Sequence, residues 1–168
     1  MNILIISQYF WPENFKINDV AKHLKIKKFK ITVLSTYPSY PNKDHFASFS
    51  KKSKIPKDLE SINIIRVPII ARTSGYINLL LNYISFTVSS IICIFTQLRK
   101  KKFDLIFVFQ TSPATVLIPA LVMSRRIKAP IIVWILDLWP ETLAAIGIIK
   151  NSLIYHLSNK FFTFLYEK

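Results

Sequence analysis

Five short apolar runs, rich in β-branched residues, recur along the chain and are separated by segments of helical periodicity. The runs cover residues 2–7, 30–35, 61–67, 103–109 and 130–136. Runs of this length and composition are typical of strands that are buried on both faces of a sheet. The pattern therefore predicts five strands of a parallel sheet, with the run at 130–136 as a central, buried strand.

The segments between the runs predict helices. Apolar residues at three-to-four spacing indicate helices over about 15–28, 114–126, 141–146 and 151–166. Asn14 and Asn18 are alternative caps for the first of these helices, and Gly147 suits the end of the third.

The order of these elements predicts the fold class. Strand, helix and strand within residues 2–35 form a βαβ unit, whose parallel strands are joined by a right-handed crossover. The later elements repeat the alternation, so we expect an α/β fold: a Rossmann-like, doubly wound parallel sheet of order 3-2-1-4-5. In such a sheet, ligands bind in a crevice at the carboxyl ends of the strands, where the strand order reverses.

Residues 73–98 carry no charge and lie between Arg72 and the basic run 99–102, so on length alone they are a transmembrane candidate. They divide into two stripes, however. The apolar stripe comprises Leu80, Leu81, Ile84, Val88, Ile91, Ile92 and Phe95, and the polar stripe comprises Asn78, Asn82, Ser85, Ser89 and Thr96. The polar content favours a crossover helix buried on the sheet over a membrane-inserted one. A monotopic helix, packed on the sheet and touching lipid, stays open.

The least regular segment is 37–60. It lacks sustained periodicity and contains the lysines Lys43, Lys51, Lys52, Lys54 and Lys57. Loops of this length inside a compact domain are usually functional or disordered. We predict a long, mobile, basic loop within a single domain that covers 1–168.

The charge balance points to an anionic partner. Lys+Arg 23 against Asp+Glu 9 gives a formal net charge of +14. Phosphate-bearing substrates, anionic lipids and nucleic acid all suit this charge, and a generally basic proteome would produce it without any such partner. The single Cys93 excludes a disulfide framework, and no secretory signal precedes the first strand, so we expect a cytoplasmic protein. A hydrophobic content of 51% requires either a thoroughly buried core or contact with a membrane.

Three loops should converge at the crevice, residues 8–14, 110–113 and 137–141. A carboxylate at the carboxyl end of a strand makes Asp137 the first candidate for catalysis, with helix capping as its alternative. For Glu141, a charge at a helix N-terminus is at least an equal alternative.

The same loops supply candidates for substrate binding. Trp11 and Trp139 offer flat apolar faces to the C–H groups of sugars, although isolated aromatic residues more often serve packing. Glu13 and Asn14 suit either sugar hydroxyl groups or the end of the first helix. The full candidate set is Trp11, Glu13, Asn14, Gln110, Ser112, Trp139 and Glu141.

Glycine-rich phosphate loops are absent from the sequence. Its two glycines, Gly75 and Gly147, do not follow the first strand, which excludes a Gly-x-Gly-x-x-Gly cradle and a Walker loop. We therefore expect this domain not to hold a nucleotide by itself. The three histidines lack metal-ligand spacing, so no metal and no other cofactor are expected.

Five motifs, in sequence order, carry a resemblance to a known family. They are ISQYFWPENFKINDVAKHL, YPSYP at 37–41, NYISF at 82–86, QTSP at 110–113 and DLWPE at 137–141. Together they resemble the amino-terminal domain of family 4 glycosyltransferases with the GT-B fold. Within that family they look like the bacterial transferases of O-antigen and capsule synthesis, including the fucosamine transferases. The resemblance covers nearly the whole chain.

The resemblance implies a metal-independent, retaining transfer of a sugar from a nucleotide-diphosphate donor to a lipid-linked saccharide. In that family the amino-terminal domain mainly binds the acceptor. Asp137 lies where relatives place a polar residue against the donor sugar, and the loop around Trp11 to Asn14 lies near the donor phosphates and the acceptor. The family's carboxy-terminal domain carries the nucleotide site. We expect this chain to be truncated before the last strand of its domain and completed by that second domain, in cis or from another chain.

The basic residues complete the expected partners. Under this hypothesis anionic lipid or the acceptor pyrophosphate lies against Lys51, Lys52, Lys54, Arg99, Lys100, Lys101, Lys102 and residues 125–126. The protein would then be peripheral to the inner face of the cell membrane. Two alternatives remain: a catalytically inactive, membrane-associated binding domain, and a nucleic-acid-binding protein. Charge alone suggests the second, which has no recognisable motif for reading bases.

Overall fold

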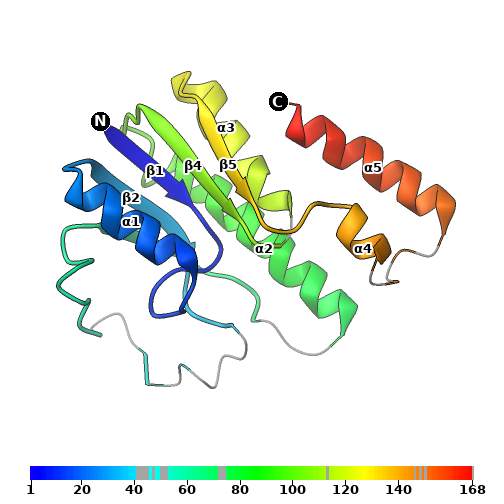
Figure 1. Cartoon of the computed structure of the whole chain (residues 1–168), viewed down its shortest axis with the longest axis horizontal. Coiled ribbons are helices and arrows are strands. Elements are labelled where there is room, and N and C mark those ends of the chain that lie inside the picture. Colours follow the sequence, from blue (N-terminus) through cyan, green and yellow to red (C-terminus); the bar gives the residue numbers. More distant parts are fainter. Residues whose placement is uncertain are drawn as a thin grey trace.

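Five parallel strands form a single sheet with the order β3-β2-β1-β4-β5 (Figure 1). The computed structural model describes residues 1–40, 46, 48–49, 53–71, 75–112, 114–145, 147, 149 and 151–167, with only the backbone of Tyr76. The strands are β1 (Asn2–Ile6), β2 (Lys30–Thr36), β3 (Asn63–Val67), β4 (Leu105–Gln110) and β5 (Ile131–Ile135). The parallel pairing and the strand order confirm the predicted α/β, Rossmann-like, doubly wound sheet.

Helices cover both faces of this sheet, α1 on one face and α2 with α3 on the other (Figure 1). The helical elements are α1 (Lys16–Ile26), α2 (Tyr76–Phe95), the short 3-10 helix η2 (Ala114–Val116), α3 (Leu117–Ile127), α4 (Glu141–Ala145) and α5 (Ser152–Tyr166). The predicted caps of α1 are wrong: Phe15 occupies the N-cap position without a side-chain hydrogen bond. Asn14 is exposed there, and the side chain of Asn18 bonds to the preceding loop instead.

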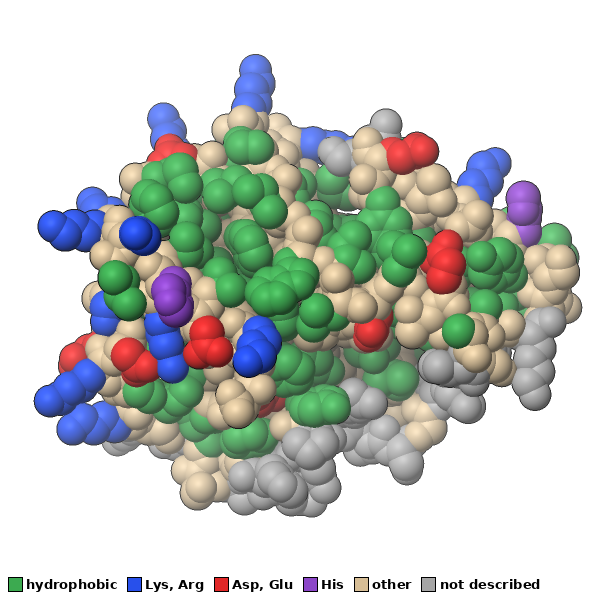
Figure 2. Space-filling model, viewed as in Figure 1, with side chains coloured by type: hydrophobic (Ala, Val, Ile, Leu, Met, Phe, Trp, Pro, Cys, Tyr) green, Lys and Arg blue, Asp and Glu red, His purple; other side chains and the backbone are tan. Residues whose placement is uncertain are grey.

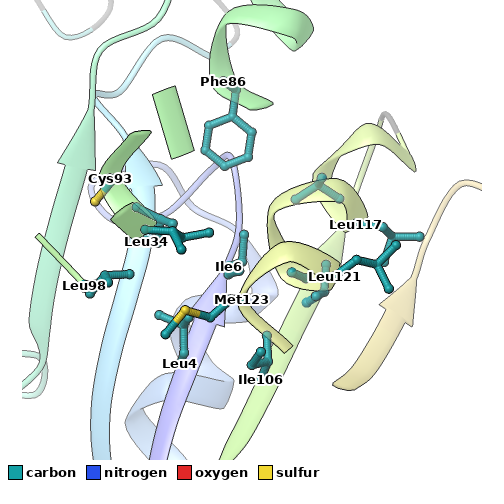
Figure 3. Close-up of a cluster of buried hydrophobic side chains, with 14 of the residues drawn as sticks. Leu4, Ile6, Leu34, Phe86, Cys93, Leu98, Ile106, Leu117, Leu121 and Met123 are labelled. Carbon is teal, nitrogen blue, oxygen red and sulfur yellow. The ribbon is translucent and has the colours of Figure 1, made fainter. Parts of the chain in front are cut away.

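The alternation of side chains along the strands produces two apolar layers. Leu4 and Ile6 of β1 point to the layer beneath α2 and α3, where they meet Phe86, Leu117 and other buried side chains (Figure 3). Ile3 and Ile5 point to the opposite layer, beneath α1. Alternate residues of one strand therefore hold helices on both faces, which fixes the register of the sheet.

Helix α2 packs on the sheet through its more polar side. Asn82 accepts a 2.7 Å hydrogen bond from the Gln8 side chain and donates a 2.6 Å bond to the Ile70 carbonyl. The Ser85 hydroxyl accepts from the Ile70 amide, and Thr87 donates to backbone carbonyls. The helix is thus a crossover helix on the sheet, as predicted, but most of the apolar stripe faces outward. By length and composition, Ile77–Phe95 would also suffice to cross a membrane.

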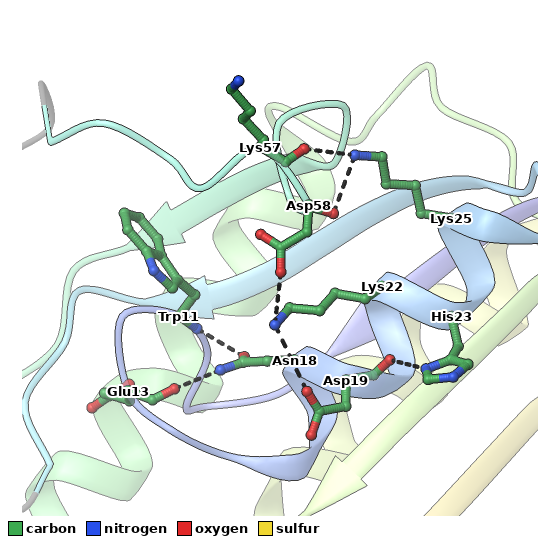
Figure 4. A network of polar contacts seen from close by, with 9 residues as sticks. All are labelled: Trp11, Glu13, Asn18, Asp19, Lys22, His23, Lys25, Lys57 and Asp58. Carbon is green, nitrogen blue, oxygen red and sulfur yellow. Dashed lines mark hydrogen bonds and ion pairs between the residues drawn. The ribbon is translucent and has the colours of Figure 1, made fainter.

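The described end of the predicted mobile loop is packed rather than free. Leu59 and Ile62 are buried beneath α1, and Ile55 packs against the same cluster. Lys22 of α1 forms a 2.8 Å ion pair with Asp58, and Lys25 donates to the carbonyls of Lys57 and Asp58 (Figure 4). Residues 55–60 thus pack against α1, and the mobility of the loop stays a prediction. Lys43, Lys51 and Lys52 lie outside the described residues.

Strand β5 is the outer strand of the described sheet, not a central one. Its side chains on the α1 side continue a band of hydrophobic surface beside α1 (Figure 2). Trp134 of this strand packs edge-on against Phe109, and Ile132 and Leu136 are about half exposed, at 50% and 51%. The expectation of burial on both faces is therefore wrong for β5, because α1 covers only the other half of that face.

Candidate functional site

A cleft of about 370 Å³ opens at the carboxyl ends of the strands. The side chains that line it are Tyr9, Phe15, Tyr40, Tyr83, Thr111, Ser112, Leu136 and Asp137. Each of the three loops expected to converge contributes: Tyr9 from the first, Thr111 and Ser112 from the second, and Asp137 from the third. α2 adds Tyr83. The cleft thus lies at the switch point of the sheet, where open α/β folds bind ligands.

Packed aromatic rings form one wall of the cleft. Tyr9 stacks on Phe15 with ring centroids 5.0 Å apart and an interplanar angle of 12°. Tyr40 leans against both rings, at 5.3 Å from Tyr9 and 5.5 Å from Phe15. Rings that are fixed by one another offer a preorganised apolar surface with polar phenol groups, as ligand pockets commonly do.

Buried hydroxyl groups hold the turn that presents Tyr9. The Ser7 hydroxyl donates to the Tyr9 carbonyl at 2.6 Å. Ser35 and Thr36, at the end of the neighbouring strand β2, donate to the Gln8 carbonyl at 3.1 and 2.8 Å. Because all three hydroxyls are buried, these bonds are shielded from water and fix the start of the loop.

Asn18 holds the middle of the same loop from inside α1. Its side-chain oxygen accepts from the Trp11 amide at 3.0 Å, and its side-chain nitrogen donates to the Glu13 carbonyl at 2.7 Å (Figure 4). This double contact explains why Asn18 is not a helix cap. It also ties the position of residues 11–13 to the helix beneath them.

Glu13 ties two loops together and does not face the cleft. Its carboxylate accepts from the amides of Ser39 and Tyr40 at 2.9 and 2.8 Å, and more weakly from Phe10 at 3.3 Å. The residue is only 2% exposed, and burial raises the pKa of its carboxyl group above 4.5, against the opposing effect of these hydrogen bonds and of Arg66. The predicted contact of Glu13 with substrate is therefore replaced by a positioning role for Tyr40.

Arg66 is a site residue that the sequence analysis missed. Its guanidinium donates to the carbonyls of Thr36 and Trp11, and it lies 5.1 Å from the centre of the Phe49 ring. Burial lowers the pKa of Arg66, although the nearby Glu13 carboxylate opposes this shift. A charged residue within the apolar run at 61–67 was the available signal, because strands rarely bury a lone cation without partners.

Trp11 lies in a different pocket from the aromatic wall. This second pocket, also about 370 Å³, is lined by Trp11, Tyr37, Phe49, Ser53, Ile55, Ile64, Arg66 and Gln97. Trp11 meets the Phe49 ring edge-on, with centroids 5.5 Å apart. Asn14 is exposed and lines neither pocket. The structure thus separates Trp11 and Asn14 from Ser112 and Asp137.

Asp137 projects into the cleft from a backbone that Gln110 holds. The Gln110 side chain is fully buried and donates 2.9 Å hydrogen bonds to the Asp137 carbonyl and to the Tyr166 hydroxyl. Gln110 is therefore a positioning residue and does not line the cleft. In the described part of the chain, the Asp137 carboxylate has no hydrogen bond or ion pair and does not cap α4. It is available to accept hydrogen bonds from hydroxyl groups.

Trp139 and Glu141 lie outside the cleft. Trp139 packs edge-on against Tyr83 and Phe162, at 6.4 and 5.4 Å, on the margin of the core. Its indole nitrogen is buried and has no partner among the described residues. Glu141 is exposed in the first turn of α4, where a negative charge suits the helix dipole. Packing and helix stabilisation account for both residues.

The basic residues that were predicted to face lipid or acceptor phosphate, where described, lie far from the cleft or are exposed to solvent. Arg99, Lys100, Lys101 and Lys102 precede β4 and line a pocket of about 580 Å³ with Arg126 and Lys128. This pocket is at the amino ends of β4 and β5, so the length of β4, about 20 Å, separates it from the cleft. Residues 99–102 therefore do not line the cleft, and their contact with anionic lipid or an acceptor pyrophosphate stays a prediction. Lys54 is exposed.

Within the described ranges, no group of three or more His, Cys, Asp or Glu side chains is placed to hold a metal ion. The cleft instead combines aromatic rings, hydroxyl groups and one carboxylate. These groups can stack on sugar rings and accept or donate hydrogen bonds to hydroxyl groups.

No protein-family model matches the chain, and no curated protein does. The chain is similar in structure to the glycotransferase of kitacinnamycin, with a TM-score of 0.56 and 9% identity, over 88% of this chain and 34% of that one. It is also similar to the C-terminal domain of a hydrogenase from Pyrococcus furiosus, with a TM-score of 0.53 and 16% identity, over 79% of this chain and 90% of that one.

At these sequence identities, the similarity shows a shared fold and nothing more. The chain has a glycosyltransferase-like, Rossmann-like α/β fold that it shares with a domain of a different enzyme class. It spans about a third of the length of the glycotransferase.

Proposed function

We propose that the chain is the amino-terminal, acceptor-side domain of a family 4 glycosyltransferase. The enzyme would move a sugar from a nucleotide-diphosphate donor to a lipid-linked saccharide in O-antigen or capsule synthesis. The cleft at the carboxyl ends of the strands carries this proposal, because it joins an aromatic wall to the Asp137 carboxylate at the switch point. The sequence motifs that resemble family 4 supply Tyr9, Ser112 and Asp137 of this cleft.

In the proposed retaining transfer, the bond from the anomeric carbon to the donor phosphate oxygen breaks and a bond to the acceptor oxygen forms on the same face. The nucleotide diphosphate leaves with the electron pair of the broken bond, and its departing oxygen takes the proton of the acceptor hydroxyl group. The Asp137 carboxylate accepts a hydrogen bond from a sugar hydroxyl and stabilises positive charge that develops at the sugar ring. Tyr9, Phe15 and Tyr40 supply the surface against which the saccharide stacks.

A second domain is part of this proposal. The chain has no glycine-rich loop for the donor phosphates, so the GT-B carboxy-terminal domain, in cis or from another chain, would hold the nucleotide. The exposed apolar side chains of β5 support a further covering element, because surfaces of this kind are usually buried against protein. The complete enzyme would work without a metal, on the cytoplasmic side of the membrane.

One observation favours a second candidate, a saccharide-binding domain without catalysis. Asp137 is the only carboxylate that lines the described cleft, since Glu13 is buried and Glu141 lies outside. A lone carboxylate suffices for binding and leaves proton transfer without a partner group.

Donor turnover distinguishes the two functions. The chain is mixed or fused with a GT-B carboxy-terminal half, and release of nucleotide diphosphate from a panel of nucleotide sugars is followed. The transferase proposal predicts turnover that needs both halves and is lost in Asp137→Asn. Saccharide binding without turnover in any combination would instead identify a binding domain.

A further inference from the structure

Helix α2 presents its most apolar side to the outside of the protein. Seven large apolar side chains, each between 40% and 76% exposed, follow its length: Ile77, Leu80, Leu81, Ile84, Val88, Ile92 and Phe95. Their spacing of three and four places them on one side of the helix. The 20-residue helix is about 30 Å long, so the stripe is a continuous surface and not an isolated patch.

Contacts on the inner side fix this orientation. Asn82 bonds to Gln8 and to the Ile70 carbonyl, and Phe86 and Ile94 are buried in the core. A rotation of α2 that buried the outer stripe would expose these apolar residues and break buried hydrogen bonds. The outward stripe is therefore a stable property of the fold.

A basic cluster adjoins the carboxyl end of the stripe. The cluster comprises Arg99, Lys100, Lys101 and Lys102, which begin four residues after the end of α2 and are all exposed. Arg126 connects the two surfaces: its guanidinium lies 5.8 Å from the centre of the Phe95 ring and donates to the carbonyls of Ile94 and Arg99. No acidic residue occurs between 76 and 103. Apolar and positively charged surface thus form one contiguous face.

We propose that the outward stripe of α2, together with the basic cluster at its end, docks on an anionic lipid bilayer. The apolar side chains enter the boundary between headgroups and acyl chains, and the lysines and arginines pair with headgroup phosphates. The inference deepens the proposed function, on which the choice of a membrane as partner rests in part. The charge supports a bilayer over a second copy of this chain, because two faces of the same positive sign repel each other.

The polar contacts on the inner side keep α2 on the bilayer rather than across it. A spanning helix would have to leave the sheet and carry Asn82, Ser85 and Ser90 into hydrocarbon without their protein surroundings. The orientation along the surface also serves the cleft. Tyr83 lines the cleft and its neighbour Ile84 belongs to the stripe, so the cleft lies next to the proposed lipid-facing surface.

Vesicle flotation tests the surface without any sugar. The chain is incubated with phosphatidylcholine vesicles that contain or lack phosphatidylglycerol. We expect the chain to float with the anionic vesicles. Ile84→Glu and Val88→Glu should each lower the affinity for these vesicles at least about tenfold. Each substitution removes a large apolar side chain and adds a negative charge, which the anionic headgroups repel. Ile26→Glu is the matched control, because Ile26 is an exposed isoleucine (72%) on α1, away from the stripe.

A second measurement does not require a glutamate in α2, so it does not depend on whether the fold tolerates that charge. Val88→Cys and Ile26→Cys are labelled separately with a polarity-sensitive fluorophore; Cys93 is buried, and burial raises the pKa of its thiol, which protects it from labelling. The label at position 88 should shift to the blue on addition of anionic vesicles, and the label at position 26 should not.

Three results would overturn the inference: equal flotation of wild type and the α2 variants, no shift at position 88, or vesicle binding replaced by self-association that Val88→Glu abolishes. Because neither measurement uses sugar, the results test lipid docking independently of the transferase function. Lipid docking without saccharide binding would reject the function alone.

Discussion

The side-chain amide of Gln110, at the end of β4, donates a 2.9 Å hydrogen bond to the backbone carbonyl of Asp137, at the end of β5. The same amide also bonds to the hydroxyl of Tyr166 in α5. One buried side chain therefore joins two neighbouring strand ends to the last helix and sets the position of the one carboxylate that lines the described cleft.

Removal of this amide should destabilise the protein. We expect Gln110→Ala to lower the free energy of unfolding by about 2 kcal/mol, because a buried side-chain network loses its donor. Tyr166→Phe, which leaves the bond to Asp137 intact, should cost about 1 kcal/mol. Urea denaturation measures both, and Ser112→Ala in the cleft serves as control. Wild-type stability of Gln110→Ala would show that the amide does not hold the strand ends together.

Glu13 should give the protein a specific dependence of stability on pH. Burial raises its pKa in the folded state, so the folded protein binds a proton more tightly than the unfolded chain. The corresponding stability is fully present below the ordinary value of 4.5 and is lost as pH rises through the folded-state pKa. Between pH 4.5 and the folded-state pKa of Glu13, the free energy of unfolding should fall with rising pH in the wild type and change less in Glu13→Gln. The exposed Glu60→Gln is the control, and identical slopes in all three proteins would contradict this account.

Trp139 should behave as a packing residue. Its ring packs against Tyr83 and Phe162, while its buried indole nitrogen lacks a described partner. Trp139→Phe keeps an aromatic ring and removes the unpaired donor, so we expect a loss below about 1.5 kcal/mol. Trp139→Ala should cost about 3–5 kcal/mol. If Trp139→Phe unfolds normally but loses saccharide binding, Trp139 is a sugar platform after all.

The planar geometry of the Arg66 guanidinium should contribute more to stability than its charge. The guanidinium reaches the carbonyls of Thr36 and Trp11 simultaneously, and a lysine ammonium lacks that planar geometry. We expect Arg66→Lys to lower stability by about 1.5–3 kcal/mol, the range for hydrogen bonds to charged groups. Thermal and urea unfolding measure the effect beside Arg125→Lys, a substitution at an exposed arginine of α3. Equal stability of the two variants would assign Arg66 no such role.

The fold was predictable because apolar runs that alternate with helical segments indicate parallel strands joined by right-handed crossovers. The predicted order 3-2-1-4-5 is one of the common orders of a doubly wound sheet. The burial of particular faces was not predictable in the same way. Helix α2 turns its polar stripe inward because Asn82 and Ser85 find partners in the Gln8 side chain and the Ile70 backbone, which are distant in sequence.

The candidate site was likewise predictable in part. Convergence of the three loops follows from parallel strands, and Ser112 and Asp137 do line one cleft. Which neighbouring side chain faces the cleft depends on backbone geometry after each strand. Glu13 and Gln110 are chemically suitable for sugars, yet unpaired amides and carbonyls nearby draw both into the interior.

Saccharide binding at Asp137 is the decisive measurement for a sugar site at the carboxyl edge of the sheet. The isotopically labelled chain is titrated with N-acetylglucosamine 1-phosphate, and backbone amide shifts are followed by NMR spectroscopy. We expect saturable shifts at Tyr9, Thr111, Ser112 and Asp137, and an affinity at least about tenfold weaker in Asp137→Asn, because a hydrogen bond to a charged group is lost. Saturable shifts confined to residues 99–102, or equal affinity of the Asp137→Asn variant, would contradict a sugar site at the carboxyl edge of the sheet.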